Sequence, residues 1–220
     1  MSYNFNFRDV WRYGELLVEG TVLTLELSAI SILFGLVLGI LGAAMRTSGI
    51  APARWSAAAY VEVIRNTPLL VQLFIVFFGL PSLGVKLSAT AAAVITLSVN
   101  LGAYATEIVR AGIQAIPRSQ IEAGLSLGMS RYEVFRHVVL FQAVRIIYPA
   151  LASQFILLLI ATSIVSQIAA RELFHIGSFI ESRTFRSFEV YLVITGLYLA
   201  LALLLRGAFA TVYWLVFARR

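Results

Sequence analysis

Five long apolar stretches follow one another along the chain and are separated by short polar segments. They cover about residues 20–45, 57–80, 87–109, 137–165 and 190–216. Roughly 20 apolar residues of helix are enough to cross a hydrocarbon core about 30 Å thick. Backbone polar groups in lipid must be bonded within the protein, so these stretches are predicted to be helices. Their apolar residues run continuously, which excludes the alternating strands of a membrane barrel. The pattern therefore predicts an all-α membrane protein with five transmembrane helices.

The composition agrees with this fold class. Hydrophobic residues make up 60% of the chain and charged residues only 13%, against about 25% charged residues in soluble domains. No internal repeat and no separate soluble domain is visible, so residues 1–220 are expected to form a single membrane domain. The first 19 residues mix arginines with carboxylates, unlike the basic leader of a signal peptide.

The net charge of +6 gives a prediction for the orientation in the membrane. The basic residues are scattered among the loops, which argues against a nucleic-acid partner. An odd number of spans puts the two termini on opposite sides. With the amino terminus outside, the inner loops and inner helix ends hold more Lys and Arg than the outer ones. We therefore expect the amino terminus outside and the carboxyl terminus in the cytoplasm.

A short polar segment, QIEAGLSLGMSR, lies between the third and fourth stretches. Ser119 and Glu122 have the spacing of a capping box that opens a helix, and Gly128 is suited to the left-handed position that ends one. A second capping box, Ser130 and Glu133, is expected to open the fourth span. The segment therefore predicts a short helix, a glycine break and a long helix.

The short helix needs a support outside itself. With about eight residues it is roughly 12 Å long, and helices shorter than about 12–15 residues are marginal alone. One alternative is an amphipathic helix that rests on lipid headgroups. The other is a helix held by a second protein, whose surface could approach closely at Ala123 and Gly124. The small residues and the two capping boxes favour the second alternative.

Several segments resemble the permease subunits of bacterial ABC importers. EAGLSLGMSRYEVFRHVVLFQAVRIIYPAL is similar to their EAA loop, with Glu-Ala-small, a glycine six residues after the glutamate and a proline in the next helix. The segments GTVLTLELS, VEVIRNTPLLVQLF and AYATEIVRAGIQAIPRSQ resemble the polar amino-acid and opine branch, of histidine, glutamine, arginine and octopine type. The resemblance covers nearly the whole chain in the right order.

This resemblance implies a function and a set of partners. Residues 118–129 would be a cytoplasmic coupling loop that contacts an ATPase, through Ser119, Glu122, Ala123, Gly124 and Gly128. The chain would form the translocation pathway of an ATP-driven importer in the inner membrane, with a second permease chain, either identical or different. The other implied partners are two copies of a cytoplasmic ATPase subunit, a periplasmic solute-binding protein and a polar amino-acid-like solute. Rival functions are a passive channel and a non-transporting membrane scaffold.

The chain carries no recognisable ATP-binding or metal-binding motif of its own. A P-loop needs a lysine after glycine, and the single lysine, Lys86, lies in GVKLS. The two histidines, His137 and His175, fall on opposite sides of the membrane in the predicted topology, and there is no HExxH motif. We therefore expect no enzyme activity, no metal and no cofactor in this chain, with ATP and magnesium on the ATPase subunits.

Polar residues inside the spans are the candidates for the solute pathway, because polar groups are costly in lipid. In the third span, Thr96, Asn100, Tyr104 and Glu107 share one face of the helix. Asn100 lies near mid-span, where it either meets the solute or bonds a neighbouring helix. Glu26 could meet a cationic solute group or simply lie near the membrane interface. The full set of pathway candidates is Asn100, Tyr104, Gln154, Thr162, Ser163 and Glu26.

A second group of polar residues and prolines is expected to have structural or gating roles. Glu107 and Arg110 suit an ion pair, and Glu62 and Arg65 suit a local pair at i, i+3. Pro68 is expected to kink the second span, with Asn66 and Thr67 bonding the freed backbone groups. Pro149 is expected to kink the fourth span in the same way. The group is Glu62, Arg65, Pro68, Glu107, Arg110 and Pro149.

One departure from the resembled branch affects the expected solute. Its members often carry a Lys-Asp or similar pair just before the Thr-Ser that is here Thr162 and Ser163. In this chain the two positions are Ile160 and Ala161, both apolar. The hypothesis is that the chain binds a charged solute weakly, relies on a different partner chain, or serves another solute. A charge introduced at Ile160 is then expected to alter the transport specificity.

Overall fold

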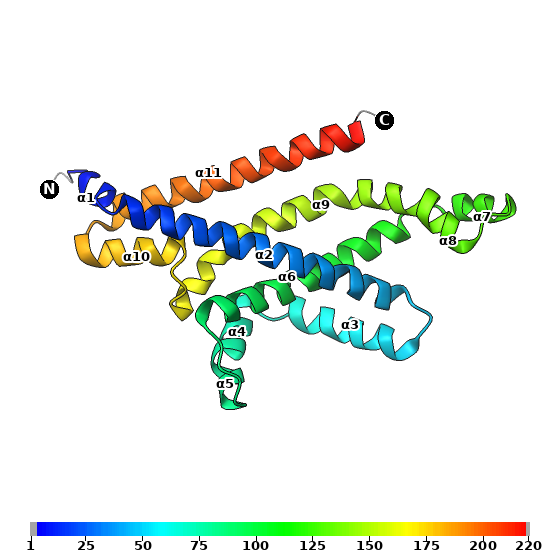
Figure 1. Ribbon diagram of the computed structural model, residues 1–220, viewed down its shortest axis with the longest axis horizontal. Helices are drawn as coiled ribbons and strands as arrows, with labels where there is room; N and C mark the ends of the chain where they lie inside the picture. Colours follow the sequence, from blue (N-terminus) through cyan, green and yellow to red (C-terminus); the bar gives the residue numbers. More distant parts are fainter. Residues whose placement is uncertain (1–3, 219–220) are drawn as a thin grey trace.

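The computed structural model describes residues 4–218, and every regular element in this part of the chain is helical (Figure 1). The long helices are α2 (Gly14–Thr47), α6 (Ala89–Gln114), α9 (Leu140–Ala161) and α11 (Ser187–Tyr213). The shorter helices are α1 (Arg8–Trp11), α3 (Ala51–Arg65), α4 (Leu69–Phe74), α5 (Leu80–Ser82), α7 (Arg118–Ser126), α8 (Arg131–Val134) and α10 (Leu173–Thr184). Single segments of π-helix are η1 (Ile75–Gly79), η2 (Phe135–Val139) and η4 (Trp214–Ala218), and η3 (Thr162–Ile168) is a 3₁₀ helix.

Four helices of the described chain are long and apolar enough to cross a membrane. They are Gly14–Thr47, Ala89–Gln114, Arg131–Ile168 and Ser187–Phe217, the third of which contains α8, η2, α9 and η3. A fifth span is reached when α3 and the helix Leu69–Ser82 are counted together as one bent pair. The prediction of an all-α protein with five spans is confirmed in this form.

The prediction of one kinked helix over residues 57–80 is wrong. The two halves of this stretch meet at an angle of 107°, and Figure 1 shows α4 and α5 leaving the bundle sideways. Pro68 does not lie inside a helix but precedes α4 in an extended conformation, with φ −65° and ψ 137°. Proline lacks an N–H group, and its ring disfavours a helical conformation of the residue before it. Pro68 therefore permits the end of α3 at Arg65.

Side chains next to the break bond the carbonyl groups that the missing helical turn leaves free. The Asn66 Nδ2 donates to the Glu62 carbonyl (2.8 Å), the Thr67 Oγ1 to the Val63 carbonyl (2.8 Å), and the Gln72 Nε2 to the Ile64 (2.8 Å) and Thr67 (3.1 Å) carbonyls. The predicted role of Asn66 and Thr67 is confirmed. The role of Gln72, whose side chain reaches back across the break, was not predicted.

Helices α2 and α6 form the closely packed centre of the bundle. Gly35, Gly39 and Gly42 lie along the face of α2 that meets α6 and are buried. A Cβ atom at Gly35 would lie 2.7 Å from the Leu101 side chain, and a Cβ atom at Gly39 or Gly42 would clash with Ala105 or Thr106. Small residues let two membrane helices approach this closely. Van der Waals contacts between their backbones and side chains, rather than the hydrophobic effect, then stabilise the helix pair.

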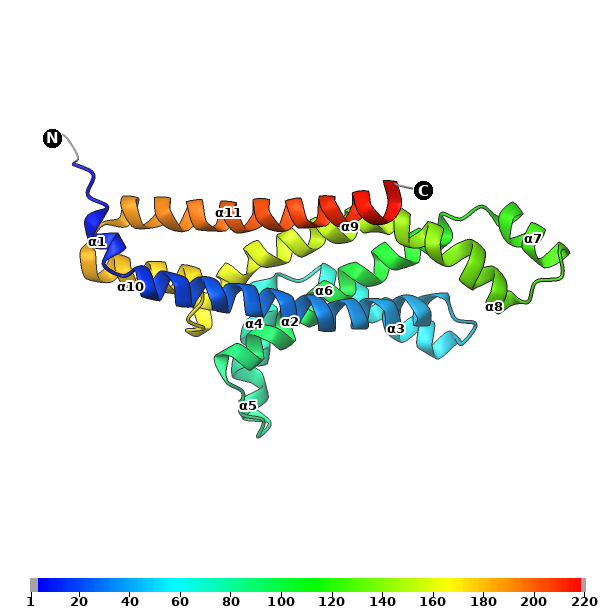
Figure 2. The same ribbon diagram turned by 45° about the horizontal axis from the view of Figure 1, so that its top comes forward.

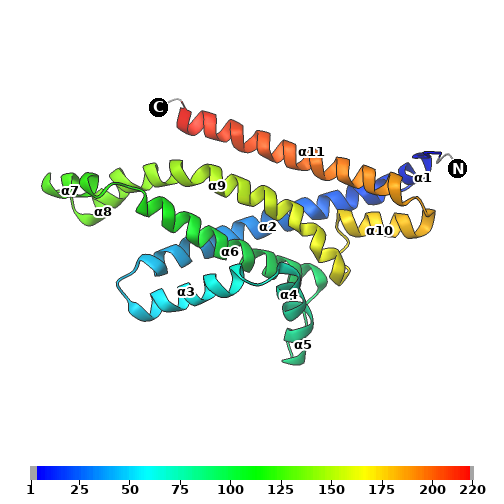
Figure 3. The same cartoon turned by 180° about the vertical axis from the view of Figure 1, so that it is seen from behind.

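The two ends of the elongated bundle differ in what they carry. α1 and α10 lie at one end, and α7 and α8 lie at the opposite end (Figures 2 and 3). The described chain begins at the α1 end, and α11 runs toward the α7 end (Figure 2). The amino-terminal and carboxyl-terminal parts therefore point to opposite ends, as an odd number of crossings requires.

A buried polar cluster fixes α10 at the amino-terminal end. Glu172, which is fully buried, accepts hydrogen bonds from the backbone N–H groups of Phe174 and His175 (2.8 Å each) and from the Tyr198 hydroxyl (2.6 Å). Burial raises the pKa of the Glu172 carboxyl above its ordinary value. Because Tyr198 belongs to α11, this carboxyl joins the loop before α10 to the last span.

Candidate functional site

The polar segment between the third and fourth spans forms the predicted helix, break and helix. α7 ends at Ser126, and Gly128 takes the left-handed conformation, with φ +82°. Ser130 and Glu133 form the predicted capping box: the Ser130 Oγ accepts from the Glu133 N–H (3.3 Å) and the Glu133 carboxylate from the Ser130 N–H (2.7 Å). The glycine break and the second capping box are confirmed.

The first predicted capping box is wrong. α7 begins at Arg118, and Pro117 stands at the N-cap with no side-chain hydrogen bond to the first turn. Ser119 is therefore already inside the helix, where its side chain cannot take the N-cap position. Pro117, with φ −57° and ψ 133°, takes the N-cap position, and the helix starts two residues before the position that a Ser119 cap requires.

α7 contacts the rest of the protein along one side only. The Gln142 Nε2 of α9 donates to the Gln120 Oε1 (2.8 Å). Gly124 is buried, and a Cβ atom there would lie 3.0 Å from a Val134 methyl group. The lack of a side chain at Gly124 therefore serves internal packing, and the predicted close approach of a partner at this residue is not supported.

The opposite side of α7 and the turn after it are open to solvent. Ser119, Glu122 and Ala123 are all exposed. Leu125 is 41% exposed and Leu127 is 84% exposed. Leu127 directly follows the end of α7, so the open side of the loop carries two exposed apolar side chains beside the polar ones.

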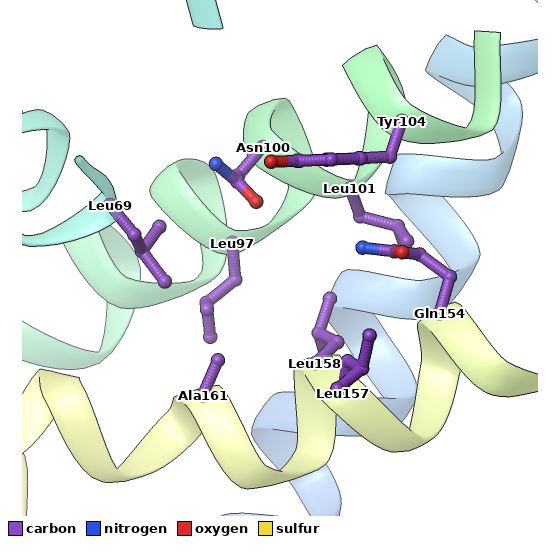
Figure 4. Close-up of a pocket in the computed structure, with 9 residues that line it drawn as sticks. All are labelled: Leu69, Leu97, Asn100, Leu101, Tyr104, Gln154, Leu157, Leu158 and Ala161. Atoms are coloured by element: carbon purple, nitrogen blue, oxygen red, sulfur yellow. The ribbon is translucent and has the colours of Figure 1, made fainter. Parts of the chain in front are cut away.

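A cavity of about 200 Å³ between α6 and α9 brings three of the pathway candidates together (Figure 4). Asn100 and Tyr104 come from α6 and Gln154 from α9. The remaining lining residues are Leu69, Leu97, Leu101, Leu157, Leu158 and Ala161. The Asn100 Nδ2 donates to the Gln72 Oε1 (3.0 Å), while its carbonyl oxygen faces the cavity in Figure 4. Both alternatives for Asn100 are therefore compatible with the structure.

The other three pathway candidates lie away from this cavity. Thr162 is fully buried and its hydroxyl donates to the Leu159 carbonyl (2.7 Å). Ser163 lines a separate hollow with Gln167 and Phe174. Glu26 is exposed on the surface of α2, which contributes no residue to the cavity. Helical spacing placed these residues in spans but did not define which face of each helix meets the cavity.

The predicted ion pair near the carboxyl-terminal end of α6 is confirmed, and a third charged residue joins it. Glu107 and Arg110 approach to 2.6 Å, and the Arg46 Nε of α2 lies 3.4 Å from the same carboxylate. Arg110 also donates to the Gln114 Oε1 (2.6 Å). The pair therefore ties α6 to the carboxyl-terminal end of α2, a contact between residues far apart in the sequence.

The predicted pair of Glu62 and Arg65 does not form. The Glu62 carboxylate accepts instead from the Asn66 Nδ2 (3.0 Å). The Arg65 guanidinium lies over the Tyr104 ring, 5.2 Å from its centroid, an arrangement stabilised by cation–π attraction. Because α3 ends at Arg65, this side chain is free to turn toward α6, where Tyr104 forms part of the cavity wall.

Two residues of the site were missed by the reasoning from sequence. Gln72 holds both the break at Pro68 and the Asn100 side chain, and Arg46 joins the ion pair of α6. Gln72 carries a signal that could have been used: it is a lone amide inside the apolar run LLVQLF, and a polar group in a membrane span needs a partner. Among the described residues, no group of three or more His, Cys, Asp or Glu is placed to hold a metal ion.

Comparison with known proteins decides the family. Residues 31–216 match the family described as "Binding-protein-dependent transport system inner membrane component". The chain belongs to this family. It is therefore a transport-system membrane component with several apolar helices.

The relatives of this membrane component include several transport permeases. It is 43% identical over 162 residues to the L-cystine transport system permease protein TcyB of Bacillus subtilis, covering 74% of this chain and 69% of that protein. It is 36% identical over 203 residues to the glutamine transport system permease protein GlnP of Escherichia coli, covering 91% and 93%.

Solved structures support the same fold. A chain of an amino acid ABC transporter, crystallised with histidines, aligns with a TM-score of 0.90 and 37% identity, covering 96% of this chain and 99% of that one. A chain of the MetNI methionine ABC transporter aligns with a TM-score of 0.77 at 23% identity, which shows a shared fold.

Proposed function

We propose that the chain is the permease subunit of an ATP-driven importer of polar amino acids or related compounds. Related permeases belong to transport systems for L-cystine and for glutamine, and a chain of an amino acid ABC transporter has nearly the same fold. The proposed pathway includes the cavity lined by Asn100, Tyr104 and Gln154. A second permease chain, identical or different, completes the enclosure, since so few helices do not surround a polar solute alone.

The observation that carries this proposal is the open side of α7. Residues 118–129 form the coupling loop, and a cytoplasmic ATPase binds the exposed side of this loop. This assignment keeps Ser119, Glu122 and Ala123 as contact residues and Gly128 as the residue that sets the turn. It adds Leu127, which is 84% exposed, as the apolar anchor. Gly124 keeps a packing role within the loop.

The remaining partners follow from the same assignment. Two copies of the ATPase carry ATP and magnesium, and movement of α7 is delivered to α9 through the Gln120–Gln142 hydrogen bond. α7 then lies on the cytoplasmic side of the bacterial inner membrane, which puts the amino terminus and α10 outside and the carboxyl terminus in the cytoplasm. A periplasmic solute-binding protein delivers the solute at the outer end, near α10.

Replacing Leu127 by Asp tests the ATPase contact. Burial of a charge in place of an apolar anchor should weaken ATPase binding by about 30-fold or more, the loss of roughly 2 kcal/mol that marks a binding hot spot. The measurement is the amount of P-loop ATPase, and of ATPase activity, that co-purifies in mild detergent with the tagged chain expressed together with its ATPase subunit.

The matched control is Leu83→Asp, because Leu83 is similarly exposed, at 79%, but lies beyond α5 and far from α7. Both variants should remain folded, since exposed substitutions usually change stability by no more than about 0.5 kcal/mol. Equal ATPase recovery with both variants would contradict the assignment of α7. ATP-dependent solute uptake by the assembled proteins in liposomes separates an importer from a passive channel and from a scaffold.

A further inference from the structure

A groove with a volume of about 470 Å³ lies between α2, α6 and α9. α2 contributes five of its fourteen lining residues, at positions 36–47, and α6 contributes Val109 and Ile113. The others belong to η2 and α9, at positions 135–151. This α2–α9 groove therefore lies in the half of the bundle that is nearer α7 (Figure 1).

The lining of the α2–α9 groove is almost entirely apolar. Twelve of its fourteen residues are apolar, and none of the fourteen, all in the described part of the chain, is charged. The two hydroxyl groups, of Thr47 and Tyr148, donate to the Ala43 and Phe209 carbonyls (2.9 Å each). A polar ligand would lose its water contacts here and find no free donor in exchange. The lining therefore suits a hydrocarbon chain.

The α2–α9 groove is open on one side. Ile40, Ala44, Phe135 and Leu140 all line it and are nevertheless exposed. The three helices that form it, α2, α6 and the helix Arg131–Ile168, are each long and apolar enough to cross a membrane. The opening therefore faces the bilayer, where exposed apolar side chains meet lipid rather than water.

The length of the α2–α9 groove matches one leaflet of a bilayer. Along α2 the rise from Leu36 to Thr47 is about 16 Å. One leaflet contributes about 15 Å, half of a hydrocarbon core about 30 Å thick. A lipid chain that enters from the α7 side would therefore follow the groove over its whole length, with its headgroup beside the last turn of α2.

Basic residues are concentrated at the α7 end of the groove. Arg46 lies in the last turn of α2, and Arg136, which is exposed, follows Phe135 of the lining. Segments 46–54, 107–122 and 131–145 together contain seven arginines and only three glutamates. Basic residues at a membrane surface attract anionic headgroups. The charge at this end therefore complements an anionic phospholipid.

We propose that the α2–α9 groove binds one acyl chain of an anionic phospholipid, whose headgroup lies among the basic residues at the α7 end. In the proposed orientation this lipid belongs to the cytoplasmic leaflet. The acyl chain fills the space between α2 and α9, the helix that Gln142 joins to α7. Lipid binding does not require that the chain transports a solute, so the site is additional to the proposed function.

A second copy of the chain is the rival occupant of the groove. A symmetric pair of copies brings the same patch of each copy face to face. The basic α7 ends would then lie near one another, and like charges repel. An anionic lipid removes this repulsion, which favours lipid over a second copy.

Lipid titration of the purified full chain tests the proposal. The chain is purified in mild detergent, depleted of lipid and titrated with dioleoyl phosphatidylglycerol, which is anionic, or with dioleoyl phosphatidylcholine, which has no net charge. Native mass spectrometry measures the lipid that each chain retains. Phosphatidylglycerol should bind about ten-fold more tightly than phosphatidylcholine, as expected when more than one arginine lies near the headgroup.

Three variants locate the bound lipid. Ala44→Phe fills the groove and should lower the affinity for phosphatidylglycerol about ten-fold, because the acyl chain loses its apolar contacts. The matched control is Ala29→Phe, at an exposed alanine of α2 that does not line the groove, and it should leave lipid binding unchanged. Arg136→Gln should weaken phosphatidylglycerol about five-fold and leave phosphatidylcholine unchanged.

Three results would overturn the proposal. The first is equal retention of phosphatidylglycerol and phosphatidylcholine by the natural chain. The second is equal behaviour of the two phenylalanine variants. The third is a change from dimer to monomer in Ala44→Phe, measured by light scattering, with unchanged lipid retention, since a second copy would then occupy the groove. None of these measurements depends on ATPase binding or on transport, so they are separate from the test of the proposed function.

Discussion

Two prolines interrupt long apolar stretches of this protein, with opposite results. At Pro68 the chain turns by 107° between α3 and the helix that follows. At Pro149 the helix continues, and α9 runs from Leu140 to Ala161 with the proline inside it. The residue type is the same, and both sites lie in stretches that composition alone marks as membrane spans. The difference must therefore come from the neighbouring side chains.

At Pro68 the side chains favour an open turn. Asn66, Thr67 and Gln72 donate hydrogen bonds to carbonyl groups that a continuous helix would have bonded itself. With these groups satisfied, the backbone can leave the helical path without leaving polar groups unpaired in an apolar setting. The local sequence therefore makes the break energetically acceptable.

At Pro149 the neighbouring helices hold α9 along its path. The Tyr148 hydroxyl donates to the Phe209 carbonyl of α11 (2.9 Å), and its ring packs against Tyr213 and Phe217. On another side, Ile147 fills the space that Gly112 of α6 leaves open. A proline inside a helix removes one hydrogen bond, and here packing on two sides keeps the helix continuous. The comparison shows that proline permits a break, while donors and packing decide whether one occurs.

Of the substitutions that test this comparison, Gln72→Leu should lower the free energy of unfolding most. The substitution removes the donor to the Ile64 and Thr67 carbonyls and the acceptor for Asn100. Leaving buried polar groups unpaired should lower the free energy of unfolding by about 2–4 kcal/mol. Denaturation of the purified chain in mild detergent measures the change. Gln154→Leu is the matched control, expected to change stability by less than about 0.5 kcal/mol. An equal loss of stability in the two variants would contradict the role of Gln72 in stabilising the break at Pro68.

Tyr148→Phe tests the packing that holds α9, with a smaller effect. The ring contacts remain while the hydrogen bond to the Phe209 carbonyl is lost. Loss of one such bond should reduce the free energy of unfolding by about 0.5–1.5 kcal/mol. The same denaturation assay measures it. Tyr132→Phe is a suitable control, because Tyr132 is 68% exposed, and a loss of stability there as large as at Tyr148 would argue against the proposed support of α9.

Pro68→Ala should have the smallest effect and should leave the bend in place. The unfolded chain gains freedom, which should cost about 0.4–1 kcal/mol of stability, but the side-chain donors of the break remain. Spin labels at the exposed positions Trp55 and Phe78 report the geometry by their separation. One straight helix would separate these positions by about 35 Å. A shorter separation in both the natural chain and the variant is expected, and a separation near 35 Å in the variant would show that proline alone sets the bend.

Features with a short sequence spacing could largely be predicted from the sequence. The spans, the left-handed Gly128, the Ser130–Glu133 capping box and the Glu107–Arg110 pair all follow from neighbours along one chain segment. Suitable local spacing alone did not determine which predicted pairs form. Glu62–Arg65 and Ser119–Glu122 have equally good spacing, yet Arg65 prefers an aromatic ring on another helix, and Pro117 moves the start of α7.

Features that join distant segments could not be predicted. Gln72 meets Asn100 across 28 residues, and Arg46 meets Glu107 from a different helix. Of the residues predicted for the solute pathway, Asn100, Tyr104 and Gln154 line the cavity, whereas Thr162, Ser163 and Glu26 lie elsewhere. The rotation of each helix about its axis, which decides these cases, is set by packing such as the glycine face of α2 against α6.

The helix Arg131–Ile168 has a consequence for how far the polar loop stands from the bilayer. Its 38 residues correspond to about 57 Å of helix, nearly twice the roughly 30 Å of a hydrocarbon core, so one end must project into water. The charged residues Arg131, Glu133 and Arg136 occur at the α8 end and none occurs after Arg145. The projecting end is therefore the one that carries α7. The loop therefore projects into water beyond the lipid headgroups, where a soluble protein, a protease or an antibody can reach it.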